Sequence, residues 1–544
     1  MYSRDNDPGY RSDNYYLTTA LADNAISFLQ QHEKESPDKP FFLYLAFTAP
    51  HWPMHALAED IFKYRGRFDK GYDALRRDRV ERMKKLGLLP PQWEIPSTAG
   101  RWEDVKNREW ELRCMEVYAA MIDRMDREIG RLVAELKRQG RLDNTLILFL
   151  QDNGASAEEM GRQPRKPAAT EFEPLRPDQL PLSRPPLQTR EGKPVLSGTD
   201  VMPGGPDSYI AYGENWANVS NTPFREYKHW VHEGGISTPL IVHWPAGIPE
   251  SRRNSLVHDP AHLIDIMATC VDVAETTYPT ERGGEKIKPL QGISLRPAFE
   301  GRPLERKEPL FWEHEGNRAV RRGKWKLVAK EDQPWELYDM EADRTEMHNL
   351  AAEMPELVRE LAAEWDAWAA RCDVLPLGGW RPRKVVHQDI PRLILKAGEA
   401  LAPEKSPAVH DRALTVSVEL LAPHGDGVLA AHGGRKVGYA LYVKDGRLCF
   451  DLRKGGRLIT VPAREPLPDR PATVAAVLNT EGNLRLLIDG RVVASRGRAG
   501  LLPRTPGEGL SAGHDSGDPV GEYPPSFPYA GRLGEVRIEM EVWQ

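Results

Sequence analysis

Residues 41–47, FFLYLAF, form a nearly continuous apolar run that starts directly after a Lys-Pro pair. A run of this length predicts a strand that is buried on both faces, as in a parallel sheet. Two later stretches have the same character, TLILFL at 145–150 and PLIVHW at 239–244. These three runs predict the strands of a buried sheet.

Helical patterns precede and separate these runs. Apolar residues recur at helical spacing over 17–29 and over 111–138, where Gly140 follows as a stop. Strands that alternate with helices predict an α/β core. Residues 155–215 are rich in Pro, Gly and Arg without periodicity, so we expect a long surface excursion near the end of the TLILFL strand.

The second half of the chain changes character. Residues 319–338 form short segments that suit a small antiparallel sheet, and a helical pattern follows over 356–370. Short alternating strands dominate after about residue 411, with Asp-Gly turns at 445–446 and 489–490, and they predict an all-β sandwich. The predicted divisions are an incomplete α/β core at 1–300, a C-terminal subdomain at 301–377, a linker at 378–410 and a β-sandwich at 411–544.

The composition indicates a globular protein of more than one domain. At 544 residues the chain needs two or more domains, and 40% hydrophobic with 28% charged residues is normal for a globular protein. The formal net charge of -6 indicates neither nucleic acid nor an anionic membrane as a partner. No apolar run approaches the roughly 20 residues that cross a bilayer. The four scattered cysteines favour free buried thiols over a pairing such as Cys270 with Cys372.

Three polar motifs follow or precede the predicted strands. His51 follows FFLYLAF, Asp152-Asn153 follows TLILFL, and Lys228 precedes a Gly-Gly pair and PLIVHW. Ligands of open α/β sheets bind at the carboxyl ends of strands, and an Asp-Asn pair offers oxygen ligands for Ca²⁺ or Mg²⁺. Each motif also has an ordinary interpretation, namely a structural loop histidine, turn chemistry and a solvated lysine.

Taken together, FFLYLAFTAPHWP, DNTLILFLQDNG, NTPFREYKHWVHEGG and ELYDMEADRTEMHNLA resemble the type I sulfatases of the alkaline-phosphatase superfamily. The resemblance covers about residues 15–377 and implies a mixed sheet flanked by helices. It also implies a formylglycine, made from a Cys-x-Pro/Ala-x-Arg motif, whose hydrated aldehyde attacks sulfur beside a bound Ca²⁺. Asp152 and Asn153 would be metal ligands, Lys228 would contact sulfate, and His51 would contact sulfate or protonate the leaving group.

The resemblance is incomplete in one respect. None of the four cysteines lies in a Cys-x-Pro/Ala-x-Arg context, and the family's nucleophile, paired aspartate and Lys/His pair precede the segment where this chain starts. We therefore expect weak or absent Ca²⁺ binding, exposed apolar strand surfaces and no activity of this chain alone. The expected explanations are an incomplete sequence with an internal Met1, a separate N-terminal partner chain, or a catalytically dead protein.

Other histidines have weaker claims. We expect His55 at the surface and expect His232 to orient the Gly-Gly turn. Packing or exposure is expected for His229 and His243, and a role in shaping the cleft for His314 and Glu315.

The stretch from about 411 to 544 resembles a laminin-G or concanavalin-like sandwich, carried by GYALYVKDGRLCF, LRLLIDGRVVAS and GHDSGDPVGEY. Asp515 and Asp518 are candidates for a loop-bound Ca²⁺, but turn chemistry is favoured.

The function that the resemblance implies is hydrolysis of sulfate esters, with a sulfated small molecule or glycan as substrate. The alternatives are a phosphonate or phosphate ester hydrolase of the same superfamily and a non-catalytic glycan-binding protein. Family members are often exported, whereas the polar residues 1–16 resemble no signal peptide, so a periplasmic, secreted or cytoplasmic location stays open.

Overall fold

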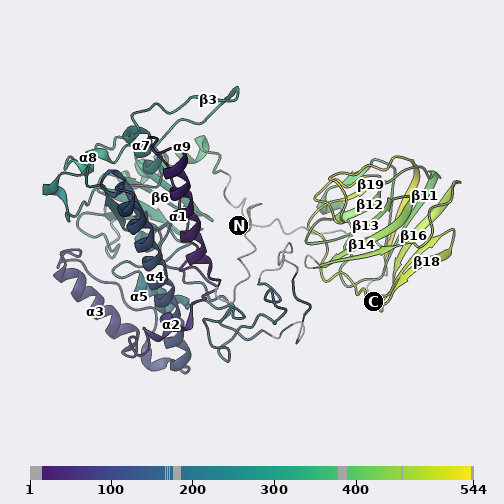
Figure 1. Cartoon of the computed structure of the whole chain (residues 1–544), viewed down its shortest axis with the longest axis horizontal. Helices are drawn as coiled ribbons and strands as arrows, with labels where there is room; N and C mark the ends of the chain where they lie inside the picture. The colour runs from purple at the N-terminus through teal and green to yellow at the C-terminus, as the bar shows by residue number, and fades with distance from the viewer. Residues whose placement is uncertain are drawn as a thin grey trace. The chain divides into compact units, whose positions relative to one another are not determined.

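The computed structural model describes residues 15–165, 185–375, 389–454 and 457–540, together with residues 167, 170, 172–175 and 377. The chain divides into two compact units, Met1–Pro167 with Val195–Trp380, and Ala168–Pro194 with Arg381–Gln544. Figure 1 draws their elements from purple to yellow along the chain. The predictions for residues 1–14 and for residues 378–388 of the linker lie outside the described residues.

The first unit contains most of the helices. They are α1 (Leu17–Glu35), α2 (Ala58–Phe62), α3 (Gly71–Lys85), α4 (Arg108–Arg138), α5 (Gly213–Ser220), α6 (Glu233–Ile236), α7 (Ile264–Val273), α8 (Arg296–Phe299) and α9 (Pro355–Arg371). Short 3₁₀ segments lie at Trp102–Asp104, Leu142–Asn144 and Glu250–Arg252. The helices predicted over 17–29, 111–138 and 356–370 are confirmed as α1, α4 and α9.

Helix α4 is the longest element and packs alongside α1 (Figure 1). Its acidic first turn and basic last turn complement the helix dipole. Arg131 reaches Asp23 at 2.6 Å and Arg138 reaches Glu33 at 2.7 Å, so ion pairs along the exposed margin join the two helices. Trp110, Cys114, Val117, Ala120 and Met121 of α4 are buried in a core that also includes residues of α2, α3 and α5.

The sheet beside these helices is small. Strand β1 (Ile147–Leu150) pairs antiparallel with β2 (Leu240–His243), with Ile147 opposite His243. TLILFL and PLIVHW therefore form strands as predicted, but the expected parallel arrangement is wrong for this pair. No other described strand hydrogen-bonds to either of them. The strands are half-buried on average because neither is covered on both faces.

The apolar run over 41–47 is extended but forms no strand with any described residue, so that prediction is wrong. Its side chains alternate between half-buried and exposed, with Phe42 76% and Tyr44 82% exposed. A strand needs a hydrogen-bonded neighbour, and this run has none within the described ranges. The prediction of an exposed apolar surface is confirmed.

The rest of the first unit is antiparallel. Strands β5 (Leu310–His314), β6 (Asn317–Arg322), β7 (Trp325–Ala329) and β8 (Glu336–Asp339) form a four-stranded sheet in that order. The indole of Trp365 on α9 is fully buried and packs with Val320, Leu327 and Leu337 of this sheet. The predicted small antiparallel sheet is confirmed. A two-stranded ribbon, β3 (Glu281–Arg282) with β4 (Glu285–Lys286), completes the unit.

The second unit holds two six-stranded sheets whose facing side chains belong to one hydrophobic core. One sheet has the order β10-β19-β12-β13-β14-β15 and the other β18-β17-β16-β11-β20-β9. The strands are β9 (Arg392–Leu395), β10 (Ala400–Leu401), β11 (Leu414–Ala422), β12 (Gly427–Gly433), β13 (Val437–Lys444), β14 (Arg447–Lys454), β15 (Arg457–Pro462), β16 (Ala472–Leu478), β17 (Leu484–Ile488), β18 (Arg491–Arg496), β19 (Leu510–Ala512) and β20 (Arg532–Met540).

Both predicted hairpin turns of the second unit are present. Asp445-Gly446 and Asp489-Gly490 have positive φ at both residues, which is the backbone that tight hairpin turns require.

The cysteines are all free thiols, as predicted. Cys114 and Cys449 are buried and the other two are half-buried, and burial raises the pKa of the Cys449 thiol to about 11. Across the described ranges, no helix has both the length and the apolarity that a bilayer span needs.

Candidate active site

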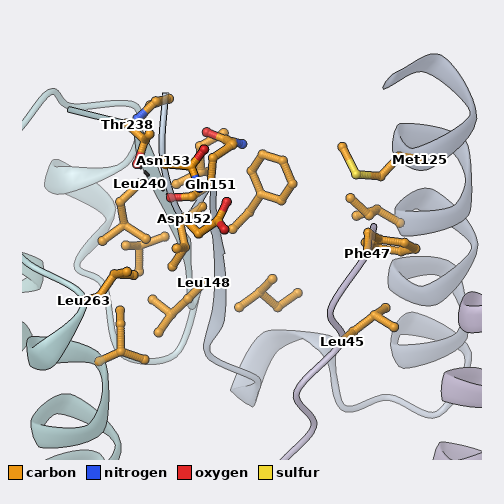
Figure 2. Close-up of a pocket in the computed structure, with 18 of the residues that line it drawn as sticks. Leu45, Phe47, Met125, Leu148, Gln151, Asp152, Asn153, Thr238, Leu240 and Leu263 are labelled. Carbon is orange, nitrogen blue, oxygen red and sulfur yellow. Dashed lines mark hydrogen bonds between the residues drawn. The ribbon is translucent and has the colours of Figure 1, made fainter. Parts of the chain in front are cut away.

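The predicted site residues line one large open cavity of about 4140 Å³ in the first unit. Figure 2 shows Gln151, Asp152 and Asn153 at the end of β1, across the cavity from Leu45, Phe47 and Met125. Apolar groups make up the larger part of the wall, and charged side chains such as Arg79, Arg252 and Asp259 also line it. His51 and Lys228 line the same cavity.

The cavity brings two of the predicted residues into contact. Lys228 Nζ lies 3.1 Å from His51 Nε2 and also donates to Glu158 Oε2 at 3.1 Å. Lys228 is placed by its backbone, since its N–H donates to the carbonyl of Ala155 just beyond the Asp152-Asn153 pair. A cation and an imidazole thus face the cavity side by side.

The tautomer of the His51 ring follows from its neighbours. Nδ1 lies 2.6 Å from the backbone carbonyl of Trp52, which only accepts, so Nδ1 carries the hydrogen. The Nε2 lone pair then accepts from the Lys228 ammonium. In this state His51 is a hydrogen-bond acceptor at the cavity, and it becomes an acid only after it gains a second proton.

Glu158 is a site residue that the sequence analysis missed. Its Oε2 accepts from Trp52 Nε1 at 2.7 Å, Ser156 Oγ at 2.6 Å and Lys228 Nζ. Partial burial raises the pKa of this carboxyl, but the three donors outweigh burial and the net pKa lies below its ordinary value. Glu158 is therefore a carboxylate that neutralises Lys228. It lies in the aperiodic stretch after Asn153, where no pattern singles it out.

Close backbone packing explains the glycines of both motifs. A Cβ on Gly154 would lie 1.7 Å from the carbonyl oxygen of Gly234, and a Cβ on Gly234 would lie 2.1 Å from the carbonyl oxygen of Arg225. The N–H of Gly154 also donates to the carbonyl of Gly235 at 2.9 Å. Only glycine permits this approach, which sets the end of β1 against the start of α6.

Asn221 joins these segments through its side-chain amide. Oδ1 accepts from the N–H of Ala155 at 2.8 Å, and Nδ2 donates to the carbonyls of Glu226 at 2.9 Å and Gly234 at 2.6 Å. The segment after β1 and the segment from Asn221 to Gly235, which both carry candidate site residues, are thereby tied at one point. Asn221 was part of a quoted motif, but its sequence context did not reveal this role.

Asp152 and Asn153 are the predicted metal ligands. Asp152 is exposed and Asn153 half-buried at the end of β1. Within the described part of the chain, Asp152 belongs to no group of three or more His, Cys, Asp or Glu side chains with converging ligand atoms. Ca²⁺ takes about 6–8 oxygen ligands, so these two residues fit only part of such a site.

A buried ionic cluster of Lys326, Glu233 and Glu346 lies next to the Gly234-Gly235 turn. Lys326 Nζ lies 2.9 Å from Glu233 Oε1 and 2.8 Å from Glu346 Oε1, and all three side chains are buried. Burial raises the pKa of Glu233, but Lys326 and Arg344 outweigh it and hold the pKa at about 2. The first helical residue after His232 is thus a carboxylate that stays ionised.

The other candidate residues have varied surroundings. His55 is half-buried and its Nε2 lies 2.8 Å from the carbonyl oxygen of Ser208, so the prediction of a surface position is wrong. His232 is fully buried, and its carbonyl accepts from the N–H groups of Gly235 and Ile236, which fits the predicted role at the turn.

Most of the remaining candidate residues have exposed side chains. They are His229, His243, His314 and Glu315. In the second unit, Asp515 is buried and accepts from Tyr523 Oη and from the N–H groups of Gly517 and Val520, which is the favoured turn chemistry.

Comparisons with known proteins identify the family of the chain. A family model described as Sulfatase matches residues 1–276, and one described as N-sulphoglucosamine sulphohydrolase, C-terminal, matches residues 225–369. The chain is similar to an uncharacterised sulfatase of Schizosaccharomyces pombe, with 32% identity over 391 residues, 69% of this chain and 66% of that protein. It is similar to an arylsulfatase of Klebsiella aerogenes, with 31% identity over 299 residues, 54% of this chain and 58% of that protein.

Among solved structures, a similar one is Ps i-CgsB, with 22% identity, a TM-score of 0.41, and coverage of 66% of this chain and 60% of that chain.

Beside the segment that follows β1, the cavity brings Lys228 and His51 together near the side-chain oxygens of Asp152 and Asn153, a set of groups that suits an anionic ligand. The sulfatase family model matches half of the chain, so the chain belongs to the sulfatase family. Its alignments span 66% and 58% of the two relatives' own lengths.

Proposed function

We propose that this chain provides part of the active site of a type I arylsulfatase, which hydrolyses a sulfate ester to an alcohol or phenol and sulfate. The observation that carries the proposal is the contact between Lys228 and His51 at the cavity. A sulfate ester group is a compact anion, and a lysine held by its backbone next to an imidazole offers it charge and a hydrogen bond.

Each residue has a distinct task in this proposal. Lys228 exchanges Glu158 for a sulfate oxygen and keeps positive charge where negative charge develops. His51, once doubly protonated beside the bound anion, donates a proton to the departing alkoxide oxygen. Glu158 keeps Lys228 directed toward the cavity before substrate binds.

The proposed metal is Ca²⁺, which neutralises sulfate charge when it is bound. Asp152 and Asn153 would supply two of its oxygen ligands. Since affinity follows the number and charge of the ligands, we propose that this polypeptide alone binds Ca²⁺ weakly or not at all.

None of the four cysteines lies in a Cys-x-Pro/Ala-x-Arg motif, which supports the proposal that the 544 residues do not carry the nucleophile. We propose that this polypeptide alone is inactive, and that turnover needs a further segment or a separate chain that carries the formylglycine. A strand of that segment alongside residues 41–47 and β1 would complete an alkaline-phosphatase-like mixed sheet. The two six-stranded sheets of the second unit are proposed to form a concanavalin-like sandwich.

The deciding experiment reads the coding DNA upstream of Met1. An in-frame paired aspartate and Cys/Ser-x-Pro/Ala-x-Arg motif is the expected result. The extended protein, coexpressed with a formylglycine-generating enzyme, should then hydrolyse 4-nitrophenyl sulfate faster than 4-nitrophenyl phosphate. The reverse preference would favour the phosphate ester hydrolase, and an upstream stop codon without any activating partner chain would refute the enzyme proposal.

A further inference from the structure

Three exposed side chains meet beside Lys228 on two separate loops. His229 follows Lys228 directly, His314 ends β5, and Glu315 begins the turn into β6. One ligand atom from each of the three lies within 4.8 Å of the others. His229 and His314 also line the cavity that holds Lys228. Their convergence is independent of the Asp152-Asn153 pair and of any sulfatase activity.

The ring of His314 is held in one tautomer. Its Nδ1 lies 3.0 Å from the backbone carbonyl of His229, so Nδ1 is the donor and Nε2 keeps its lone pair. Metal-binding histidines usually donate their other N–H to a carbonyl or carboxylate in this way. His314 is therefore prepared to bind a cation through Nε2.

The second and third ligands are already close together. His229 Nδ1 lies 3.0 Å from Glu315 Oε2, so this nitrogen carries the ring hydrogen in the metal-free chain, and it binds an ion once that hydrogen moves to Nε2. Two ligand atoms of a tetrahedral Zn²⁺ site lie about 3.4 Å apart when each is about 2.1 Å from the ion. A small side-chain rotation would bring this pair to that separation.

The backbone under the cluster is unusual at both loops. The backbone φ is +99° at His229 and +49° at Glu315, and residues other than glycine rarely adopt such positive φ values. The buried Asn317 donates from Nδ2 to the carbonyl of His229 at 3.1 Å, so a second bond holds the first loop against the hairpin. Left-handed residues of this kind concentrate at functional sites.

We propose that His229, His314 and Glu315 form a binding site for a divalent transition-metal ion, with Zn²⁺ as the best match. Two imidazole nitrogens and one carboxylate oxygen suit Zn²⁺ and not Ca²⁺, which prefers oxygen ligands only. Three protein ligands leave one position for water or for an oxygen of a ligand in the cavity. The site differs in chemistry from the calcium ligands proposed at the end of β1.

The test titrates the full chain, freed of metal by chelation, with Zn²⁺ against a chromophoric chelator. One Zn²⁺ per chain is expected, and His314→Ala and Glu315→Gln should each weaken binding at least about tenfold. The matched control is His348→Ala, because exposed His348 pairs with Glu94 at 3.3 Å and belongs to no group of three among the described residues. This variant should bind like the parent.

Two further measurements exclude other sources of binding. Asp152→Asn should keep the Zn²⁺ affinity, and the Co²⁺-loaded chain should show d–d absorption without a thiolate charge-transfer band, which separates the site from the cysteines. Unchanged circular dichroism shows that each variant is folded. Zn²⁺ binding that is absent, or that is equally strong in His314→Ala and the parent, would overturn the proposal.

Discussion

Lys228 Nζ and His51 Nε2 lie 3.1 Å apart although 177 residues separate them in the chain. Residues 49–54 and 224–230 reach this contact because each loop packs against the segment after β1. This contact lies in the large cavity of the first unit, and its consequences and those of the neighbouring contacts can be measured.

Lys228→Met should reduce the activity of the extended, formylglycine-containing protein by about 10²–10³-fold, since it removes a charge aimed at the developing anion. Steady-state kinetics with 4-nitrophenyl sulfate measures the loss. Lys70→Met is the control, because Lys70 pairs with Asp78 at the surface and does not line the cavity. Equal activity of the Lys228 variant and the parent would remove Lys228 from the site.

Asn221→Ala should lower the free energy of unfolding by about 2–4 kcal/mol, because it removes three hydrogen bonds and leaves their backbone partners poorly satisfied. Urea denaturation followed by tryptophan fluorescence measures it. Asn24→Ala removes only one exposed bond to Ala20 and should have little effect. A similar small effect in both variants would show that Asn221 does not tie the loops together.

Lys326→Met should destabilise the protein by about 3–5 kcal/mol, because it leaves the buried carboxylates of Glu233 and Glu346 without their cation. The neighbouring Lys324→Met is a matched control, since Lys324 forms its ion pair with Asp339 at the surface. Its denaturation midpoint should stay close to the parent's. If the two variants were equally stable, the buried cluster would not support the fold.

The pH dependence of stability should reflect Glu233. Its folded-state pKa of about 2 lies below the ordinary value of 4.5, so the folded state binds fewer protons between these values. The stabilisation is complete above about pH 4.5 and declines as the pH falls toward 2. Thermal unfolding between pH 6 and pH 3 measures the decline, which should be shallower in Glu233→Gln. Parallel profiles for the two proteins would contradict the assignment.

The exposed apolar side chains of residues 41–47 should promote self-association of the chain and binding of apolar dyes. The double variant Phe42→Ser with Tyr44→Ser should bind less of an apolar dye and self-associate less, because these rings are 76% and 82% exposed at the cavity. Dye fluorescence and light scattering report both effects. Phe62→Ser is the control, as Phe62 is 71% exposed on α2 outside the cavity lining. An equal reduction by the control would mean that exposure alone matters.

Much of the local structure is predictable from the sequence. The apolar stripe of α4, the Asp-Gly turns of the second unit and the strands β1 and β2 follow from short-range patterns, because helical spacing and turn composition act over a few residues. The combination of motifs around His51, Asp152 and Lys228 was also sufficient to indicate the sulfatase family, which the family match confirms.

Which strands pair and which distant side chains contact one another was decided by the tertiary structure alone. Residues 41–47 have the composition of a buried strand, yet they form none here, because a strand depends on a neighbour that local sequence does not encode. Glu158, Asn221 and the cluster of His229, His314 and Glu315 have no distinguishing local pattern. Their roles come from backbone approaches such as that of Gly154 to Gly234, which bring distant loops within hydrogen-bond distance.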